Sequence, residues 1–436
     1  MLNVGVVGLG FVGLTLSVVA STRKNINVYG IDKDDEILES IGSGKAHFHE
    51  QGLNRLISGS LNEKLFVSKS FDPDISYDIF VITVGTPLQK DKLAPNFDYI
   101  KQAIEEISKV YNGNQLVILR STVSVGVTRE IIIPQLNEMK KNCNPSDILV
   151  AFCPERTVEG NAIKELQTIP QIIGANNSRS YEIAESFFRE ITPTILKVKS
   201  LEASELIKLF NNTYRDIHFS IGNYFNEIAQ SFGINGIELI NASNYGYQRS
   251  NIAKPGLVGG ACLEKDSYIL VHKMKASEGK DFVLRARNYN ESLEDKIVEW
   301  ALRKMGEHNI KAVGVSGLAF KGIPSTSDLR GSNSVSIVKK LKQSGIDVSV
   351  HDFVCSNKQL NEFGSVYDDI YDMTENVGLL LILNNNINYG ELDIMEIDRR
   401  MLTPKVVFDC WKSLDNSSLK KNVNLVTLGD MDLIDE

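Results

Sequence analysis

The stretch NVGVVGLGFVGLTLSVVAST, residues 3–22, decides the fold. A β-branched run, Val4 to Val7, leads into glycines with the spacing GxGxxG, and apolar residues continue beyond them as in a helix. In a strand–turn–helix unit, Gly8 permits the tight turn, Gly10 lets the backbone approach a pyrophosphate, and Gly13 lets the helix pack closely on the strand. The helix N-terminus then faces the anion. We therefore predict a dinucleotide-binding unit here.

A second strand pattern, INVYGID, strengthens this prediction. It ends in Asp32, about 20 residues after the glycines, where a carboxylate can accept a hydrogen bond from a ribose hydroxyl. The acid favours NAD over NADP. Phe11 and Val12, inside the glycine motif, join the predicted cofactor-binding residues. The alternative is a tight turn in an unrelated α/β fold, although strand, glycines, helix and acid occur together here.

Two further buried-strand patterns each end in a turn that contains threonine. They are YDIFVITVGTP, with Thr86, and QLVILRSTVSVGVTR, with Thr122. Parallel sheets bind ligands outside the carboxyl ends of their strands, so both threonines are expected to face the cofactor. Each taken singly is an ordinary turn residue.

The composition describes a globular chain that is too long for one hydrophobic core. It has 436 residues, of which 42% are hydrophobic and 23% charged, so we expect two or three domains. The formal net charge is -8 and the acids are spread along the chain. This charge argues against partners such as nucleic acid or an anionic membrane surface.

The cysteines and the N-terminus favour a cytoplasmic location. Five cysteines without a CxxC spacing suggest neither a disulfide framework nor a zinc site. The apolar N-terminus has no basic region before it, so we expect no cleaved signal, and no segment reaches the roughly 18 apolar residues of a membrane span. His47 and His49 resemble a metal pair, but no second cluster completes a site, and we expect no metal.

The segment CPERTVEG places two carboxylates just after a strand. Pro154 restricts Cys153 to an extended conformation, so the strand turns into a loop that carries Glu155 and Glu159. Such carboxylates can transfer a proton or hold a water. They fit a solvated turn equally well.

Residues 200–233 show apolar positions at helical spacing for about nine turns. A helix of this length commonly bridges two domains and supplies a dimer interface. Lys208 and Asn212 are four residues apart and therefore share a face. The alternative is a solvated lysine above a polar neighbour, but asparagine is a poor helix former in the middle of a helix.

The segment GGACLEKD, residues 259–266, presents a single cysteine behind two glycines. Lys265 favours a thiolate at Cys262, whereas Glu264 opposes it. Gly259 and Gly260 leave room for a backbone to approach a ligand. From these residues Cys262 is as consistent with a small buried side chain as with a nucleophile.

The last third of the chain repeats an α/β pattern. The segments NIKAVGVSGLAFKG, SVSIVKKLKQSGIDVSVHDF, VGLLLILNNN and PKVVFDCW alternate strands with helices. Lys321 and Arg330 lie in a loop at the carboxyl end of the first of these strands. A doubly wound sheet binds its ligand there, so we expect a phosphate-bearing substrate.

Together these motifs resemble the nucleotide-sugar dehydrogenases, the UDP-glucose and UDP-N-acetyl-hexosamine 6-dehydrogenases. The resemblance runs over nearly the whole chain. It rests on seven segments in order: GLGFVG, VGTP, STVSVG, CPERTVEG, ASELIKLFNNT, GGACLEKD and GLAFKG with SDLRGS.

The resemblance implies that the C6 hydroxyl of a UDP-sugar is oxidised to the carboxylate with two NAD, through a thiohemiacetal and a thioester on a cysteine. Cys262 would be that nucleophile, and Asn212 would donate to the developing oxyanion. Lys208 and Asp266 would manage protons and the hydrolytic water. A thiolate adduct suits the second oxidation because it keeps the aldehyde attached as a tetrahedral carbon.

The resemblance implies further contacts. Thr122 and Glu159 match catalytic and cofactor positions near the water and the nicotinamide. NAD contacts are also implied for Lys265 and Arg330, in addition to Thr86, which its place at a strand end already suggests. Substrate contacts are implied for Glu155, Arg156, Lys208, Asn212, Arg249, Gly259, Gly260 and Lys321.

The chain also departs from the family pattern. The usual GGSCFPKD has Ala261 for the serine and Glu264 for the proline. The usual DxRN reads DCWKSLD, with Trp411 and Lys412 where an arginine is expected, and FKGIPSTSDLR is a residue longer than the common form. These departures leave the identity of the sugar open.

The expected architecture is α/β, with two Rossmann-like doubly wound parallel-sheet domains joined by a long central helix. We expect an NAD-binding domain over residues 1–195, a central helical dimerisation region with the catalytic loop over 196–300, and a UDP-sugar-binding domain over 301–436. A homodimer is expected. One alternative is a β-hydroxyacid dehydrogenase, which transfers one hydride without a cysteine; another is a non-enzymatic NAD-binding regulator.

Overall fold

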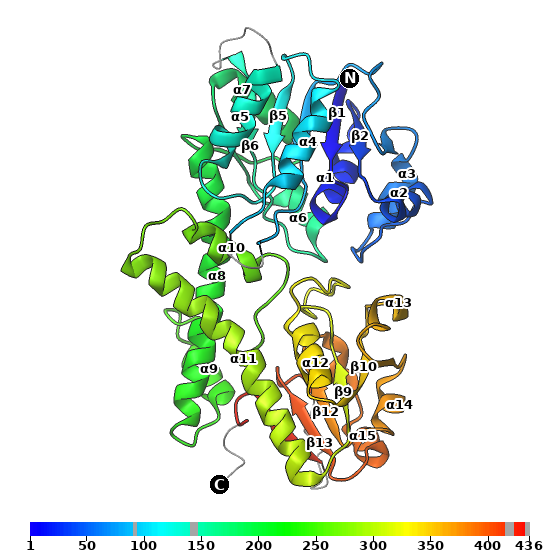
Figure 1. Ribbon diagram of the computed structural model, residues 1–436, viewed down its shortest axis with the longest axis vertical. Helices are drawn as coiled ribbons and strands as arrows, with labels where there is room; N and C mark the ends of the chain where they lie inside the picture. Colours follow the sequence, from blue (N-terminus) through cyan, green and yellow to red (C-terminus); the bar gives the residue numbers. More distant parts are fainter. Residues whose placement is uncertain (90–93, 140–146, 415–422, 432–436) are drawn as a thin grey trace. The chain divides into compact units, whose positions relative to one another are not determined.

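The chain folds into two compact α/β units (Figure 1). The computed structural model describes residues 1–89, 94–139, 147–414 and 423–431. The first unit comprises Met1–Asn211 with Tyr268–Lys275, and the second comprises Asn212–Ser267 with Ala276–Glu436. Each unit has its own sheet and its own hydrophobic clusters, and each is described by itself.

The first unit is built on an eight-stranded sheet with the order β3-β2-β1-β4-β5-β6-β7-β8. Neighbouring strands are parallel except β6 and β7. The order reverses between β1 and β4, which is the switch point where such sheets bind ligands. The strands are β1 Leu2–Val7, β2 Ile26–Ile31, β3 Leu65–Ser68, β4 Ile79–Ile82, β5 Leu116–Leu119, β6 Val150–Phe152, β7 Gln171–Ala175 and β8 Ile195–Lys197.

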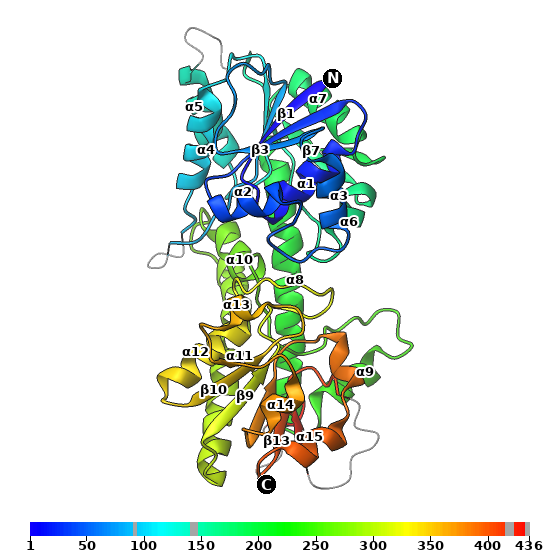
Figure 2. The ribbon, with the colours of Figure 1, turned by 90° about the vertical axis from the view of Figure 1, so that its right-hand side faces the viewer.

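Helices cover both faces of this sheet because its strands are apolar on both sides. Along β1, Val4 and Val6 join one buried cluster and Val7 joins another, as the alternation of side chains along a strand requires. Figure 2 shows α1, α3 and α6 on one side of the strands and α4 and α5 on the other. The helices are α1 Phe11–Ser21, α2 Asp35–Gly42, α3 Leu53–Ser60, α4 Asp98–Ser108, η1 Thr128–Ile132, α5 Ile133–Met139, α6 Ala162–Thr168 and α7 Ser178–Arg189.

The predicted long helix is present as α8, Leu201–Gln230, with 30 residues. The division into units falls within α8, after Asn211, and within α10, Leu263–Val271, after Ser267. The residues of α8 and of α10 are therefore divided between the two units, and both helices connect the units covalently.

The second unit has a six-stranded parallel sheet with the order β11-β10-β9-β12-β13-β14. Counted from β9, this is the same order of strands that the first unit shows, and its switch point lies between β9 and β12. The strands are β9 Ala312–Ser316, β10 Asp347–His351, β11 Ser365–Val366, β12 Leu379–Ile382, β13 Val406–Asp409 and β14 Asn424–Thr427.

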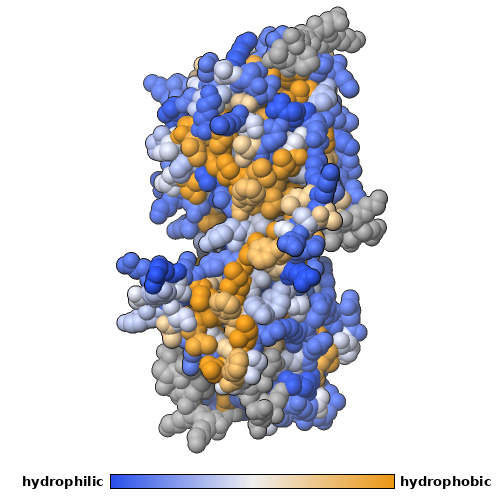
Figure 3. Space-filling view, turned by 90° about the vertical axis from the view of Figure 1, so that its left-hand side faces the viewer, coloured by the Kyte–Doolittle hydropathy of each residue, from blue (hydrophilic) through white to orange (hydrophobic). Residues whose placement is uncertain are grey.

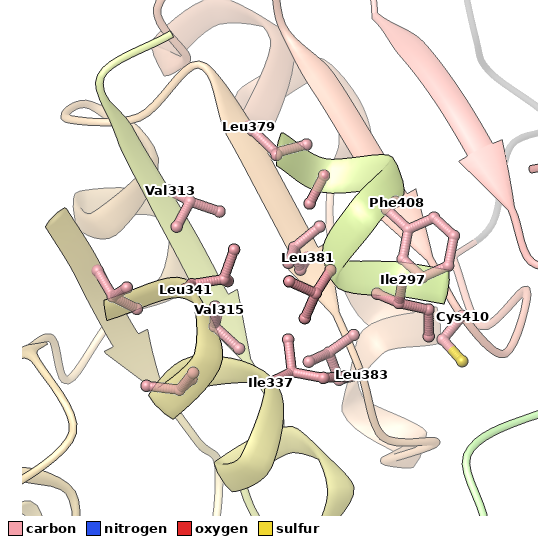
Figure 4. Close-up of a cluster of buried hydrophobic side chains, with 14 of the residues drawn as sticks. Ile297, Val313, Val315, Ile337, Leu341, Leu379, Leu381, Leu383, Phe408 and Cys410 are labelled. Atoms are coloured by element: carbon pink, nitrogen blue, oxygen red, sulfur yellow. The ribbon is translucent and has the colours of Figure 1, made fainter. Parts of the chain in front are cut away.

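A large apolar cluster lies between this sheet and its helices (Figure 4). Val313 and Val315 of β9 pack there with Ile297 and with Leu341, and all four are fully buried. The helices of this unit are α9 Gly236–Asn244, α11 Glu278–His308, α12 Asn333–Gln343, α13 Asn357–Leu360, α14 Ile370–Thr374, η3 Ile387–Glu391 and α15 Ile394–Arg400. α11 and α12 bring Ile297 and Leu341 to the cluster.

The predicted fold class is confirmed: two parallel-sheet α/β domains and a long central helix are present. The expected division at residues 195 and 300 stays a prediction. Among the described residues, no helix combines the length and the apolar character needed to cross a membrane.

Candidate functional site

The glycine motif forms the predicted turn between β1 and α1. Gly8 has a φ of +91°, which favours glycine, and a Cβ on Gly13 would lie 1.8 Å from the Gly8 carbonyl oxygen. A Cβ on Gly10 would have no heavy atom of the described residues within 4 Å, so the backbone there is open to a ligand. The Leu9 N–H donates to Asp32 Oδ2 at 2.7 Å, which fixes the acid beside the loop. This cradle fits a dinucleotide pyrophosphate and ribose.

The other predicted cofactor residues of the first unit lie after strand ends or in the first turn of α1. Thr86 follows β4 and donates its hydroxyl to the Thr122 carbonyl, at 2.6 Å, in the loop after β5. The two threonines therefore lie together. Phe11 and Val12 begin α1, and the Phe11 ring lies 5.3 Å from that of Phe48.

The loop after β6 is anchored by a buried ion pair that the sequence did not indicate. Arg120 donates to Glu155 Oε2 through Nε, at 3.0 Å, and through Nη2. Its Nη1 also donates to the Cys153 carbonyl at 3.1 Å and to Gln171 Oε1 at 2.9 Å. Burial raises the pKa of Glu155, but Arg120, a backbone N–H and Lys208 outweigh burial and hold that pKa below its ordinary value.

Lys208 and Glu155 meet in this loop. The Lys208 side chain is buried, and its Nζ donates to the backbone carbonyl of Glu155. The Glu155 carboxylate also accepts from the backbone N–H of Arg156 and of Thr157, both at 2.7 Å. The Arg156 guanidinium donates to a backbone carbonyl of the same unit, and Glu159 is half-buried in the same loop. A loop held at this many points fixes where Lys208 can place its ammonium.

In the second unit, the buried carboxylate of Asp266 accepts hydrogen bonds from Asn212 and from Lys265. Asn212 Nδ2 donates to Asp266 Oδ2 at 2.6 Å, and Lys265 Nζ donates to Asp266 Oδ1 at 2.9 Å. Asp266 is fully buried. Burial lowers the pKa of Lys265, but Asp266, Cys262 and Glu264 raise it more, and the net direction is upward. Lys265 is therefore a lasting positive charge close to the thiol.

Cys262 lies directly before α10 and is exposed. The N–H groups of Lys265 and Asp266 donate to its carbonyl at 3.2 and 2.9 Å, so Cys262 stands where a helix begins. The N-terminus of a helix and a nearby lysine both favour a thiolate. Of the two interpretations that the sequence left open, exposure excludes the small buried side chain.

The two glycines before Cys262 have a structural reason of their own. A Cβ on Gly259 would lie 2.4 Å from the Gly331 carbonyl, and a Cβ on Gly260 would lie 2.4 Å from the Phe320 ring. Gly260 also has a φ of +93° and donates its N–H to the Gly331 carbonyl at 2.7 Å. They let the cysteine loop pack against the loop after β9, which the sequence interpretation, room for a ligand, did not foresee.

The remaining predicted residues of the second unit make contacts of other kinds. Arg330 pairs with Asp328, with Nη2 2.6 Å from Oδ2, and Lys321 lies over the ring of Phe320. Arg249 lies over the ring of Tyr247, 4.9 Å from its centroid. No group of three His, Cys, Asp or Glu in the described part of the chain could hold a metal ion.

Sequence reasoning also missed a buried ion pair, Asp216 with Arg287, that contacts the cysteine loop. Asp216 and Arg287 pair at 2.8 Å with both side chains 1% exposed, so the pair lies in the interior. A signal was available for Asp216, because it follows Lys208 and Asn212 at intervals of four residues on α8. Arg287 lies 71 residues further on, and no local pattern connects the two.

Three family models match nearly the whole chain. They belong to the UDP-glucose/GDP-mannose dehydrogenase family and describe its NAD binding domain over residues 2–192, its central domain over 202–292 and its UDP binding domain over 314–416. The central domain includes Lys208 and Cys262. The domain that carries the glycine fingerprint is thus the NAD binding domain of the family.

Curated relatives and solved structures agree with the family models. The UDP-N-acetyl-D-mannosamine dehydrogenase of Methanococcus aeolicus is 29% identical over 98% of this chain and 94% of its own. The enzyme of the same name from Campylobacter jejuni is 32% identical over 78% of this chain and 83% of its own. The structure of UDP-D-ManNAc dehydrogenase from Pyrococcus horikoshii is similar with a TM-score of 0.88 and 27% identity, covering 99% of this chain and 100% of that one.

These matches confirm the predicted NAD cofactor and the predicted dehydrogenase activity on a UDP-sugar. The matches over all three domains and the relative that is 32% identical lead to one conclusion. The chain belongs to the UDP-glucose/GDP-mannose dehydrogenase family.

Proposed function

We propose that this chain oxidises UDP-N-acetyl-D-mannosamine at C6 to the uronate, with Cys262 as the covalent nucleophile. The choice of sugar follows the names of the similar proteins from M. aeolicus, C. jejuni and P. horikoshii. The observation that carries the mechanism is the exposed thiol at the start of α10. It lies four residues before Asp266, the buried carboxylate to which Asn212 donates. The overall reaction consumes one water and two NAD and yields the carboxylate, two NADH and three protons.

The first unit provides the residues that would hold NAD, which accepts the hydride when bound. The open space at Gly10 and the left-handed turn at Gly8 suit the pyrophosphate, and Asp32 suits the ribose. Thr86, Thr122 and Glu159 complete the proposed cofactor set of this unit. Lys265 and Arg330 are proposed from the second.

The second oxidation needs the aldehyde carbon to become tetrahedral, and addition of the Cys262 thiolate achieves this. The thiolate attacks the aldehyde carbonyl and forms a C–S bond; loss of hydride gives a thioester, and water then breaks that bond and releases the carboxylate. An amide has two N–H groups, so Asn212 can bond Asp266 with one and the oxyanion with the other. Such a donor stabilises the transition state by about 3 kcal/mol. Lys208 and Asp266 would move the protons.

The substrate contacts proposed from the family stay proposals. Glu155 and Arg156 are held by the loop contacts of the first unit, so they would position the sugar from a fixed backbone. Lys321 and Arg249 each lie over an aromatic ring and would turn from it to bind the substrate. Gly259 and Gly260 would offer backbone groups.

We also propose a homodimer formed through the outer face of α8. The exposed apolar side chains Tyr214, Ile221, Phe225 and Ile228 recur at helical spacing on one face. Figure 3 shows apolar side chains gathered on this side of the chain. A second copy would cover this face. Light scattering should give twice the 48.5 kDa chain mass, and Phe225→Asp should give the single-chain mass at the same concentration.

We propose a cytoplasmic location because the described cysteines are thiols and not disulfides. None of the described cysteines forms a disulfide, and Cys262 has to be reduced to act as a nucleophile. A reducing compartment keeps it so.

The deciding experiment counts NADH per sugar. UDP-N-acetyl-D-mannosamine, UDP-N-acetylglucosamine and UDP-glucose are each supplied in limiting amount with excess NAD. We expect two NADH per molecule of UDP-N-acetyl-D-mannosamine and a lower kcat/KM for the other two. One NADH per sugar would favour a β-hydroxyacid type of dehydrogenase, and NAD binding without NADH formation would favour a regulator.

Two cysteine variants complete the test. Cys262→Ala should lose uronate formation while the chain still binds NAD. Cys355→Ala removes a buried thiol outside the proposed machinery and should keep the stoichiometry. Uronate formation at the normal rate by Cys262→Ala would overturn the covalent mechanism.

A further inference from the structure

A buried carboxylate on α8 gathers donors from two other helices. Asp216 is 1% exposed, which leaves its charge dependent on protein partners. It accepts from Arg287 Nη1 at 2.8 Å and from Asn290 Nδ2 at 2.9 Å, both on α11, and from Ser267 Oγ at 2.8 Å, on α10. All these residues belong to the second unit. The carboxylate therefore fixes the Arg287 side chain in one orientation.

Arg287 reaches from this carboxylate to both ends of the cysteine loop, residues 258–263. Its Nη2 donates to the Val258 carbonyl at 2.9 Å, and its Nη1 donates to the Leu263 carbonyl at 3.2 Å. Gly259, Gly260, Ala261 and Cys262 lie between these two acceptors. The loop has no strand or helix of its own over these four residues. One guanidinium thus ties together the two backbone groups that flank the thiol segment.

A second set of bonds secures the approach to the loop. Asn223 Nδ2 donates to the Gly256 carbonyl at 3.1 Å, and the Gly256 N–H returns a bond to Asn223 Oδ1 at 2.8 Å. Asn223 also donates to Asn290 Oδ1 at 3.0 Å, and Asn290 in turn holds Asp216. The loop is therefore attached to α8 and α11 at three backbone positions.

The chemistry of arginine explains why this position holds it. Its planar guanidinium presents five donors in a fixed fork, whereas a lysine ammonium is a compact charge on a flexible stem. A lysine at 287 keeps the charge that pairs with Asp216 but cannot span two carbonyls and a carboxylate. A buried charge costs stability unless it is fully bonded, and such a network is retained where it specifies a geometry.

We propose that Arg287 is a positioning residue for Cys262: with Asp216 it holds both flanks of the cysteine loop and thereby places the thiol at the N-terminus of α10. The catalytic consequence rests on the proposed function of Cys262. The placement itself is a property of the folded chain and can be measured without substrate. A thiol held at a helix N-terminus reacts as a thiolate at lower pH than a thiol on a loose loop.

Several charged groups set the field at this thiol and must be kept constant in the test. They come from α10, α11, α8 and the loop after β9: Glu264, Lys265, Asp266, Arg287, Glu291, Asp216, Asp328 and Arg330. Arg287→Lys changes no formal charge among them. A shift in thiol reactivity in this variant therefore reports geometry and not the loss of a charge.

The experiment measures alkylation of Cys262 by iodoacetamide from pH 5 to 10, resolved by mass spectrometry of its peptide. In Arg287→Lys we expect the pH midpoint to rise by at least half a unit, kcat to fall at least tenfold, and the Kd for NAD to stay within twofold. Arg285→Lys is the matched control, because it makes the same substitution at an exposed position of the same helix, α11. It should keep the midpoint within 0.2 pH units of the parent and kcat within about twofold.

Ser267→Ala is the second variant, because it removes one bond to Asp216 and keeps the arginine. We expect a smaller rise of the midpoint and a kcat two- to fivefold lower, and it decides the matter if Arg287→Lys does not fold. An unchanged midpoint in a folded Arg287→Lys, or in Ser267→Ala when the lysine variant is unfolded, overturns the proposal. If Cys262→Ala turns over normally while the midpoint still rises in Arg287→Lys, the mechanism fails and the positioning of the thiol stands.

Discussion

Replacing Arg120 by methionine tests how the loop that carries Glu155 is held. The substitution removes every bond of the guanidinium and leaves an apolar chain of similar length. Glu155 would keep its two backbone N–H donors, from Arg156 and Thr157, but would lose its buried counter-ion. The Arg120 and Glu155 side chains are 1% and 6% exposed, so water cannot replace the lost partner. We expect the first unit to become less stable.

The size of the effect follows from the burial. Removing one partner of a buried ion pair costs about 3–5 kcal/mol, because it leaves an unpaired charge in the interior. At about 2–4 °C per kcal/mol for a unit of this size, a loss of 3 kcal/mol lowers the melting temperature by about 6–12 °C. The double variant Arg120→Met with Glu155→Gln removes the orphaned charge and should recover more than half of the loss.

The loss should also depend on pH in a defined direction. In the parent the pKa of Glu155 lies below its ordinary value, so the stabilising charge is present above the pKa of the unfolded chain and is lost as the pH falls through the folded one. Without Arg120, only Lys208 and the backbone N–H groups still act against burial, so the pKa of Glu155 should rise. The carboxyl then takes up a proton more easily, and the stability deficit of Arg120→Met should shrink between pH 8 and pH 5.

Scanning calorimetry with and without NAD measures this deficit, because NAD should shift the transition of the unit that binds it. Trp300 and Trp411, the two tryptophans of the chain, both belong to the second unit, so their fluorescence follows that unit as an internal control. A deficit below 1 kcal/mol, or a double variant no more stable than the single one, would refute the reasoning.

Two further predictions concern the cofactor loop and the thiol. Gly13→Ala should lower the melting temperature and abolish NAD binding, because its Cβ would lie 1.8 Å from a carbonyl oxygen. Gly10→Ala, with open space among the described residues, should keep the melting temperature but weaken NAD binding; normal affinity in calorimetric titration would contradict the assignment of the pyrophosphate. Glu264→Gln should lower the alkylation midpoint of Cys262 by about half a pH unit, roughly 0.7 kcal/mol of charge interaction, and an upward shift would contradict the opposition of the two charges.

The sequence could predict those features whose conformation depends on residues close together in the sequence. The turn at Gly8, the close contact at Gly13 and the acid at Asp32 follow from spacing, and the structure has all three. The helix predicted over residues 200–233 is Leu201–Gln230, because its apolar period runs unbroken through both units. The ion pairs of Arg120 and Arg287 could not be predicted, since their partners lie 35 and 71 residues away and are chosen by packing.

Glu264, the acid two residues after the proposed nucleophile, has a packing role that the sequence does not show. Glu264 opposes a thiolate on the sequence, yet its carboxyl lies over Gly331, where a Cβ would come within 2.5 Å of it. Burial there raises the pKa of Glu264, with Lys265 and Arg287 acting against it, so the carboxyl takes up a proton at a higher pH than a solvated one. The pKa of Lys265 moves upward as well, so its positive charge persists. The lysine therefore stays positive beside the thiol and acts against the carboxylate, and the Glu264→Gln variant measures the contribution of the acid alone.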